Sequence, residues 1–304
     1  MGLMNAVDPR VGATAPQDKG VFEVWRAGPP GAPPTPLVFA SPHSGRLYPD
    51  DMMSAAALDA VSIRRSEDAF VDDLIADAPG HGVAVIAAHV ARAYIDLNRE
   101  PFELDPAMFA DELPEFARAR TARVAAGLGA IARVVSEGQE IYRRKLMFAE
   151  ARKRIEGAHR PYHRALEALI AEAQAAHGFA ILVDWHSMPA AAAKAGGRER
   201  PSDIVLGDRF GAACAGVLPT RVERELEALG YRVARNTPYA GGYTTEHYGR
   251  PQRRTHALQV EINRALYLDE ATLAPTSGFA RLKDHIAQLT RTLAAADWSA
   301  LKAA

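Results

Sequence analysis

Two histidines follow apolar runs that are typical of buried β-strands. Residues 37–40 lead into His43, and residues 179–183 lead into His186. Open α/β sheets bind their ligands just beyond the carboxyl ends of such strands. Imidazole nitrogens are common zinc ligands, and Asp184, two positions before His186, can orient that ring. The pattern favours one metal site, and the alternative for either histidine alone is a structural role at a strand end.

A third ligand is needed for a zinc site that keeps one position open for water. Glu67 and Asp68 are the nearest carboxylates, at the start of a helix predicted over residues 67–78 with Ser66 as its N-cap. We favour Glu67, because Asp68 could instead stabilise the N-terminus of that helix. The choice between the two stays open, and a metal-free capping turn is the alternative for Glu67.

Glu261 follows a third apolar run, residues 257–260. A buried carboxylate must be paired or functional, because an unpaired charge is costly to desolvate. A zinc hydrolase also needs a group that accepts the proton of the attacking water and passes it to the leaving amine. Glu261 is therefore our candidate general base and acid, and a salt bridge to Arg264 or another arginine is the alternative.

Asn98 and Arg99 directly follow residues 93–97, which we predict to be a strand. A planar guanidinium can bind a carboxylate through two hydrogen bonds, and an amide adds a directional donor. The pair therefore suits an anionic substrate. The alternative is a surface arginine paired with Glu100 or Glu103.

The loop over residues 239–249 is a candidate wall or lid for the substrate. Its paired glycines, Gly241 and Gly242, let backbone N–H groups approach a ligand closely. We include Thr245 with them as substrate-binding candidates. The alternative is that the tyrosines of this loop pack its tip.

His159 and His163 are spaced like the metal ligands of a helix, four residues apart. No glutamate follows the first histidine, so the pair does not match the His-Glu-x-x-His pattern of zinc peptidases. We therefore place His163 at the pocket, behind the ligands rather than on the metal, and include it among the substrate-binding candidates.

Bulk composition is that of an ordinary soluble globular protein. The 304 residues are 48% hydrophobic and 24% charged, with a net charge of −1, which argues against a nucleic-acid-binding face. The single cysteine, Cys214, excludes an internal disulfide and a cysteine-based zinc site. No apolar run approaches the roughly 20 residues that span a bilayer. We expect no membrane partner and a cytoplasmic location.

Strand and helix patterns alternate along most of the chain, which indicates one α/β domain over residues 20–304 after a loose leader at residues 1–19. No composition shift marks a boundary inside that domain. The predicted strands cover residues 21–26, 37–40, 83–88, 93–97, 179–184, 231–235 and 257–261. The predicted helices cover residues 67–78, most of 114–176 with breaks near Gly138 and Pro161, 219–229 and 277–295.

Taken in order, these segments resemble the N-formylglutamate amidohydrolases. The resemblance rests on residues 41–45, 66–68, 96–99, 161–163, 184–187, 241–243 and 259–264. It extends from about residue 37 to 270 and is specific as an ordered set. The Asp-Leu-Asn-Arg segment is also similar to that of aspartoacylases, and the broader likeness is to zinc carboxypeptidases.

This resemblance implies a three-layer α/β/α fold with a mixed, mostly parallel central sheet, phosphorylase/hydrolase-like in type. By position it implies one zinc ion per chain on His43, Glu67 and His186, a carboxylate clamp of Asn98 and Arg99, and Glu261 as the general base. Carboxypeptidases place the ligand glutamate three residues after the first histidine, a position that Arg46 holds here. The second ligand must therefore come from further along the chain.

The expected function is zinc-dependent hydrolysis of an N-formyl or N-acyl amino acid, above all of N-formyl-L-glutamate to formate and glutamate. The resemblance would place this reaction last in one route of histidine breakdown. The expected ligand is a small carboxylated molecule, and the oligomeric state is left open between monomer and homodimer. His/Glu ligation also tolerates Co²⁺, Mn²⁺ and Fe²⁺. The alternatives are a zinc peptidase or amidase, and a metal-free protein that binds a carboxylated metabolite on a degenerate hydrolase fold.

Overall fold

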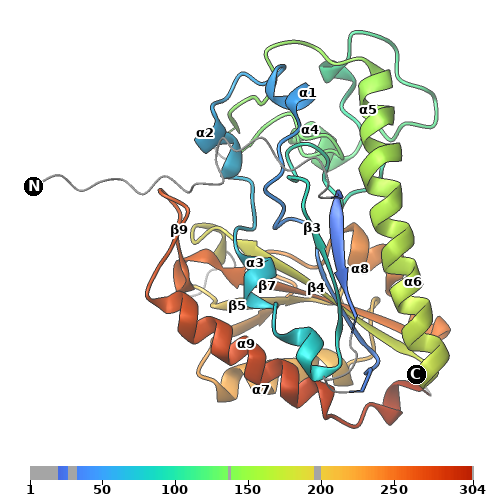
Figure 1. Cartoon of the computed structure of the whole chain (residues 1–304), viewed down its shortest axis with the longest axis vertical. Helices are drawn as coiled ribbons and strands as arrows, with labels where there is room; N and C mark the ends of the chain where they lie inside the picture. Colours follow the sequence, from blue (N-terminus) through green and yellow to red (C-terminus); the bar gives the residue numbers. More distant parts are fainter. Residues whose placement is uncertain (1–19, 27–32, 136–137, 195–199, 303–304) are drawn as a thin grey trace, which may run out of the picture.

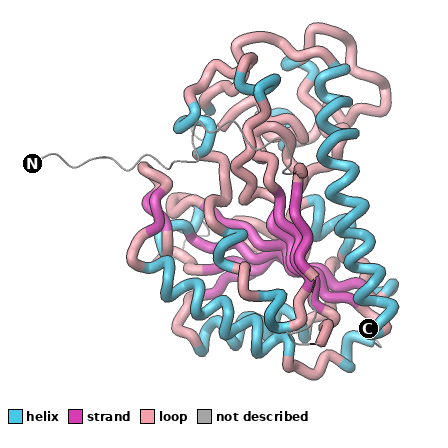
Figure 2. The backbone as a smooth tube through the Cα atoms, in the orientation of Figure 1, coloured by secondary structure: helices cyan, strands magenta, loops and turns pink. Residues whose placement is uncertain are grey.

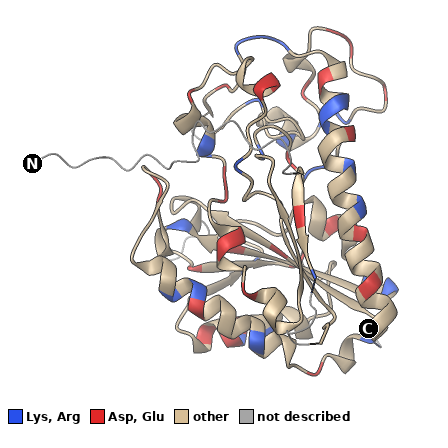
Figure 3. Cartoon of the chain, in the orientation of Figure 1, with Lys and Arg blue, Asp and Glu red and all other residues tan. Residues whose placement is uncertain are grey.

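The computed structural model describes residues 20–26, 33–135, 138–194 and 200–302 (Figure 1). The leader predicted at residues 1–19 lies outside the described residues. None of the described helices combines the length and the apolar character that crossing a membrane requires. Charged residues of both signs alternate along the outer helices (Figure 3).

Within the described residues, seven strands form one central sheet (Figure 2). Their order is β1 (Phe22–Trp25), β3 (Ala84–Ala88), β2 (Leu37–Ser41), β4 (Ala180–Met188), β7 (Thr255–Asn263), β5 (Ile204–Gly207) and β6 (Val233–Arg235). Neighbouring strands are parallel except for β1 with β3 and β5 with β7. A separate small ribbon pairs β8 (Leu268–Asp269) with β9 (Ala274–Pro275). The sheet is therefore mixed and mostly parallel, as predicted.

Helices cover both faces of this sheet and complete three layers. On one face lie α3 (Val71–Leu74), α7 (Val217–Ala228) and α9 (Gly278–Ala294). On the other lie α6 (Arg160–His177) and α8 (Tyr243–Tyr248). The upper part of Figure 1 holds loops with α1 (Asp50–Met53), α2 (Ala60–Arg64), α4 (Ala122–Ala125) and α5 (Phe148–Arg154). Short 3₁₀ helices lie at Ala78–His81, Pro106–Met108, Ala192–Lys194, Pro251–Arg253, Arg264–Leu266 and Ser299–Lys302.

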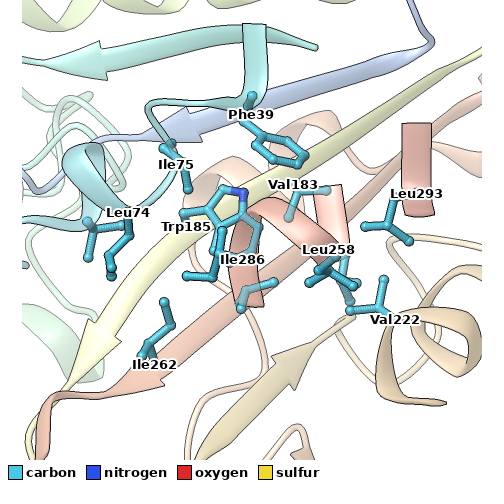
Figure 4. Packing of buried hydrophobic residues seen from close by; sticks show 14 of the residues in the cluster. Phe39, Leu74, Ile75, Val183, Trp185, Val222, Leu258, Ile262, Ile286 and Leu293 are labelled. Carbon is cyan, nitrogen blue, oxygen red and sulfur yellow. The ribbon is translucent and has the colours of Figure 1, made fainter. Parts of the chain in front are cut away.

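Side-chain alternation along β4 separates the core from the candidate site. Val183 and Trp185 face α7 and α9, and Trp185 packs against Phe39 with 5.3 Å between ring centroids (Figure 4). Leu182 faces α6 instead. Because successive side chains of a strand point to opposite faces, Asp184 and the next alternate residue, His186, share the face of Leu182. The same alternation on β7 puts Ala257, Gln259 and Glu261 on that face.

The helix predicted over residues 67–78 is wrong. Only α3 forms there, and its preceding residue Phe70 has φ 63, a left-handed conformation that interrupts a helix. The Ser66 hydroxyl donates to Ile63 O rather than capping a following turn. The Asp68 N–H donates to His43 O at 3.0 Å, so this segment is tied to the loop after β2.

Three other element predictions were also wrong. Residues 93–97 form turns rather than a strand. Continuous helix begins only at Phe148, where α5 leads through a π-helical turn (Ile155–His159) into α6. Pro161 does not break this helix, since it is the second residue of α6 and follows the π-helical turn directly. Strand β5 and helix α8 were not predicted.

Candidate active site

His43, Asp68 and His186 converge at the carboxyl ends of β2 and β4. One ligand atom from each lies within 4.8 Å of those from the other two, and all three residues are buried. Within the described part of the chain this is the one such group of His, Cys, Asp and Glu side chains. The main-chain hydrogen bond from Asp68 to His43 fixes two of the three relative to each other.

Both imidazoles direct Nδ1 at the same carboxylate oxygen. Asp68 Oδ2 lies 3.4 Å from His43 Nδ1 and 3.0 Å from His186 Nδ1. Asp96 Oδ1 accepts from His43 Nε2 at 2.6 Å. Asp184 Oδ2 lies 2.9 Å from His186 Nε2, as the spacing predicts. A carboxylate on the far nitrogen fixes the tautomer and leaves the Nδ1 lone pair aimed at the cluster.

The charges of this cluster create a strongly negative field. Burial opposes ionisation of Asp68, but the neighbouring imidazoles of His186 and His43 outweigh it and hold the pKa of that carboxyl well below its usual range. Burial also opposes the charged form of His186, yet Asp184 and Asp68 raise the pKa of this imidazole well above its usual value. A field that favours protonated histidine also favours a bound cation.

The donor set fits a divalent metal ion. Two imidazole nitrogens and one carboxylate oxygen are zinc donors, and a tetrahedral ion with bonds of about 2.0–2.1 Å separates its ligand atoms by about 3.4 Å. The contacts of Asp68 Oδ2 with the two Nδ1 atoms, at 3.4 and 3.0 Å, are close to that separation. His43 Nδ1 is buried, and its contact with Asp68 does not have hydrogen-bond geometry. This nitrogen is therefore available to a metal.

Glu67, the carboxylate favoured from the sequence, points away from the histidines. Its Oε1 accepts from Tyr48 Oη at 2.7 Å and from Arg64 Nε at 3.1 Å, and its Oε2 accepts from Arg64 at 3.3 Å. Burial raises the pKa of Glu67 against the effect of these donors. The reason given for preferring it also fails, because α3 begins only at Val71 and leaves no helix N-terminus at Asp68. The structure brings Asp68 to the cluster instead.

Glu261 lies beside the cluster on β7. The parallel register pairs it with His186 on β4. Burial raises the pKa of Glu261 to about 7, with Asp68 adding to the rise and His186 opposing it. The expected alternative, a salt bridge to Arg264, does not form, since that guanidinium donates to Asp68 Oδ1 at 3.0 Å. A carboxyl group with this pKa can accept and return a proton near neutral pH.

Asn98 supports the pair formed by Asp184 and His186. Its Oδ1 accepts from Thr244 N at 2.7 Å, which identifies the amide orientation, and its Nδ2 donates to Asp184 Oδ2 at 3.1 Å. Nδ2 also lies 3.0 Å from His186 Nε2. The Arg99 guanidinium donates to Leu128 O at 3.1 Å and to Asn98 O at 2.9 Å. Direct contact of Asn98 and Arg99 with a substrate stays a prediction.

His163 and His159 brace the chain on either side of Asn98. His163 Nε2 lies 2.8 Å from Leu97 O, and its Nδ1 lies 2.9 Å from Tyr248 Oη. His159 Nε2 lies 2.8 Å from Arg99 O. Burial lowers the pKa of His163 to about 3 and that of His159 to about 4, so both rings stay neutral. Since both nitrogens of His163 contact protein atoms, this ring lies behind the site, and a contact with substrate stays a prediction.

The glycine loop, residues 239–249, packs closely against the site. The Gly242 N–H donates to Gln259 Oε1 at 2.7 Å, so it is not free for a ligand, contrary to our expectation. A Cβ at Gly242 would lie 2.5–2.7 Å from three atoms of Asn98. Gly241 has φ +118, which disfavours any side chain there. Thr245 is fully buried beside it, and a role for Gly241 or Thr245 in substrate binding stays a prediction.

Gly242→Ala is expected to weaken metal binding, because the added methyl group would displace Asn98 and loosen the Asp184–His186 pair. Changes in groups that orient ligands usually cost 10–100-fold in metal affinity, and we expect an effect of about that size. Titration with Zn²⁺ or Co²⁺ measures it. Gly216→Ala is the matched control, because a Cβ there meets nothing within 4 Å. Equal affinities for both variants would contradict the assigned role of Gly242.

Sequence reasoning assigned no role to Arg92 or Asp96. Asp96 Oδ2 accepts from Arg92 at 2.9 Å, and a second Arg92 nitrogen lies 4.0 Å from Asp68 Oδ1. Arg99 lies 3.9 Å from the same Asp96 oxygen. Asp96 lies two positions before Asn98, just as Asp184 lies two positions before His186. This repeated spacing is the sequence signal that could have identified Asp96 as a site residue.

The fold and the buried cluster define a hydrolase with a candidate metal centre at the strand ends. A family model described as "N-formylglutamate amidohydrolase" matches residues 35–268, and the chain belongs to this family. The N-formylglutamate deformylase of Pseudomonas aeruginosa is 30% identical over 239 residues, 77% of this chain and 83% of the relative. That of Pseudomonas putida is 31% identical over 238 residues, 77% of this chain and 82% of the relative.

One solved structure agrees with this assignment, and a second shares the fold. The crystal structure of N-formylglutamate amidohydrolase from Ralstonia eutropha is 38% identical, with a TM-score of 0.85 over 91% of this chain and 98% of that chain. A gene product of Agrobacterium tumefaciens is 18% identical, with a TM-score of 0.61 over 90% of this chain and 94% of that chain, and it shares the fold.

Proposed function

We propose that this chain hydrolyses N-formyl-L-glutamate to formate and L-glutamate with a divalent metal ion, preferably zinc, held by His43, Asp68 and His186. The observation that carries the proposal is the convergence of two Nδ1 atoms and one carboxylate oxygen beside the buried Glu261. The names of the relatives support the choice of substrate. A cytoplasmic role at the end of one route of histidine breakdown belongs to the same proposal.

Zinc in such a site lowers the pKa of water to about 7 and polarises a carbonyl oxygen. The chain's own residues then supply the proton transfers and the orientation. Glu261 accepts a proton from the attacking water and returns it to the leaving nitrogen, since its pKa of about 7 suits both directions. Asp96 and Asp184 keep the Nδ1 atoms of the two histidines directed at the cluster throughout.

The two carboxylates of N-formylglutamate need positive charge, and arginines surround the acidic cluster. Arg264 is the most enclosed, with a side chain 7% exposed and tied to Asp68. Arg99 is 13% exposed, and together with Asn98 it is the carboxylate clamp that the family resemblance implies. Arg92 is 23% exposed, so its side chain is the most exposed of the three. We propose Arg92 and Arg99 as the residues that hold the substrate carboxylates.

Formate release from N-formyl-L-glutamate tests the function directly. We expect it to exceed the hydrolysis of N-acetyl-L-glutamate and of small peptides, to stop on chelation and to return with Zn²⁺. Faster cleavage of peptides would replace this proposal with a zinc peptidase. Protein purified without chelator that holds no metal and hydrolyses none of these compounds would instead be a binding protein.

A further inference from the structure

Gln259 connects the proposed general base to the glycine loop. Its Nε2 donates to Glu261 Oε1 at 2.7 Å, and its Oε1 accepts from Gly242 N at 2.7 Å. Both hydrogen bonds are buried, and the Gln259 side chain is not part of the metal-binding group. Gln259 and Glu261 are two residues apart on β7, so their side chains leave the strand on the same face.

This connection fixes the amide in one orientation. The Gly242 N–H can only donate, so the atom that it contacts must be the carbonyl oxygen of Gln259. The amide nitrogen is then the atom that contacts Glu261, and it can only donate to a carboxylate oxygen. In the described part of the chain, Oε1 is the only oxygen of Glu261 with a hydrogen bond. Oε2 is thus the oxygen left to exchange a proton.

The loop that anchors Gln259 is itself held firmly against the sheet. Arg209 N donates to Ala240 O at 2.8 Å, and a Cβ at Gly207 would lie 2.7 Å from the Ala240 carbonyl carbon. Strand β5 therefore allows the loop to lie directly on it at Gly207. Two residues beyond Gly242, Thr244 N holds Asn98 as described above. One short segment of backbone thus orients both the general base and the support of His186.

We propose that Gln259 is a positioning residue for the hydrolysis, which holds Glu261 by Oε1 and leaves Oε2 as the oxygen that takes and returns the proton. This inference rests on the proposed function and deepens it. The Gly242 N–H keeps Gln259 from rotating, so Glu261 stays aimed at the cluster without a second hydrogen bond on its reacting oxygen. A general base must be held within hydrogen-bond reach of the proton that it abstracts, which is the arrangement that Gln259 provides.

The first test replaces Gln259 by Met, which has a similar length and neither hydrogen bond, and by Asn, which is one methylene shorter and cannot span both partners. We expect each to lower kcat for N-formyl-L-glutamate by about 10–100-fold, a usual effect of removing an orienting group. KM and bound metal should stay near wild type. Gln174→Met is the matched control, because Gln174 makes its hydrogen bonds to Thr255 Oγ1 and Arg253 O, at the other end of β7.

A double-mutant cycle separates positioning from a structural role. In a Glu261→Gln background there is no base left to position, so Gln259→Met should change the residual kcat by no more than about twofold, the usual error of such cycles. A structural defect would lower kcat by the same factor in both backgrounds. Thermal unfolding and metal content of each variant, measured in parallel, show whether the replacement has unfolded the site.

Three results would overturn the inference. The first is a Gln259→Met enzyme with wild-type kcat, and the second is an equal loss in both backgrounds. The third is a loss explained by missing metal or unfolding in both the Met and the Asn variant. Failure of the proposed function has a different signature, because wild-type protein would then release no formate, and the role of Gln259 would fall with it.

Discussion

Glu261→Gln is expected to lower kcat for N-formyl-L-glutamate by roughly 10²–10⁴-fold, the usual contribution of a positioned general base. Glutamine has the shape of glutamate, and its carbonyl oxygen can still accept the hydrogen bond from Gln259. It cannot take a proton, so the step that fails is proton transfer. Because binding does not need that step, KM and metal content should stay near wild type, and steady-state kinetics with metal analysis check both.

Glu246→Gln is a suitable control for that experiment. Glu246 lies on α8, close to the glycine loop, but its side chain is 56% exposed and pairs with Arg209. The same chemical change there should leave kcat unaltered. If Glu261→Gln retained activity near wild type, Glu261 would have no place in the mechanism, whatever its pKa.

The sequence predicted best those residues of the candidate site that lie at the ends of buried strands. A buried strand alternates its side chains between two covered faces, so residues at its carboxyl end share a known place. That argument located His186 and Glu261, and the register between β4 and β7 puts them side by side. The mixed order of the sheet came from the family resemblance rather than from periodicity, which carries no information on which strands pair.

Residues held by long-range backbone contacts could not be predicted in this way. The choice between Glu67 and Asp68 depends on a hydrogen bond from Asp68 to the loop after β2, and on the pocket that Arg64 and Tyr48 make for Glu67. Local spacing suggested a helix there, and tertiary contacts replaced it with a turn. Adjacent residues of that turn point in different directions, so an error of one position changed the assigned ligand.

The loop around Asn98 shows what residue types alone leave undecided. Residue types indicated a carboxylate clamp, because amides and guanidinium groups bind anions well. In the structure the Asn98 amide is held by Thr244 N on one side and by Asp184 on the other. An asparagine that can bind a substrate can equally support a histidine, and only the fold decides which partners lie within reach.

Asp68→Asn is expected to abolish tight metal binding and, with it, formate release. Asparagine keeps the size of aspartate but removes the charge that both imidazoles face, and it offers a neutral oxygen in place of an anionic ligand. Since replacing groups that only orient ligands costs about 10–100-fold in metal affinity, loss of a ligand itself should cost more than that. Metal content after purification without chelator, and competition with a chromogenic chelator, measure the loss. His186→Ala should behave in the same way.

Glu67→Gln, one residue away, is the decisive comparison. Glu67 faces Arg64 and Tyr48, so a glutamine amide in its place should leave metal content and kcat close to wild type. It should lower thermal stability instead, because Arg64 would lose its anionic partner in a buried setting. A metal-free Glu67→Gln protein beside a metal-loaded Asp68→Asn protein would restore Glu67 as the ligand and contradict the site described here. The opposite result would show that the turn before α3, rather than a helix, sets the coordination of this enzyme.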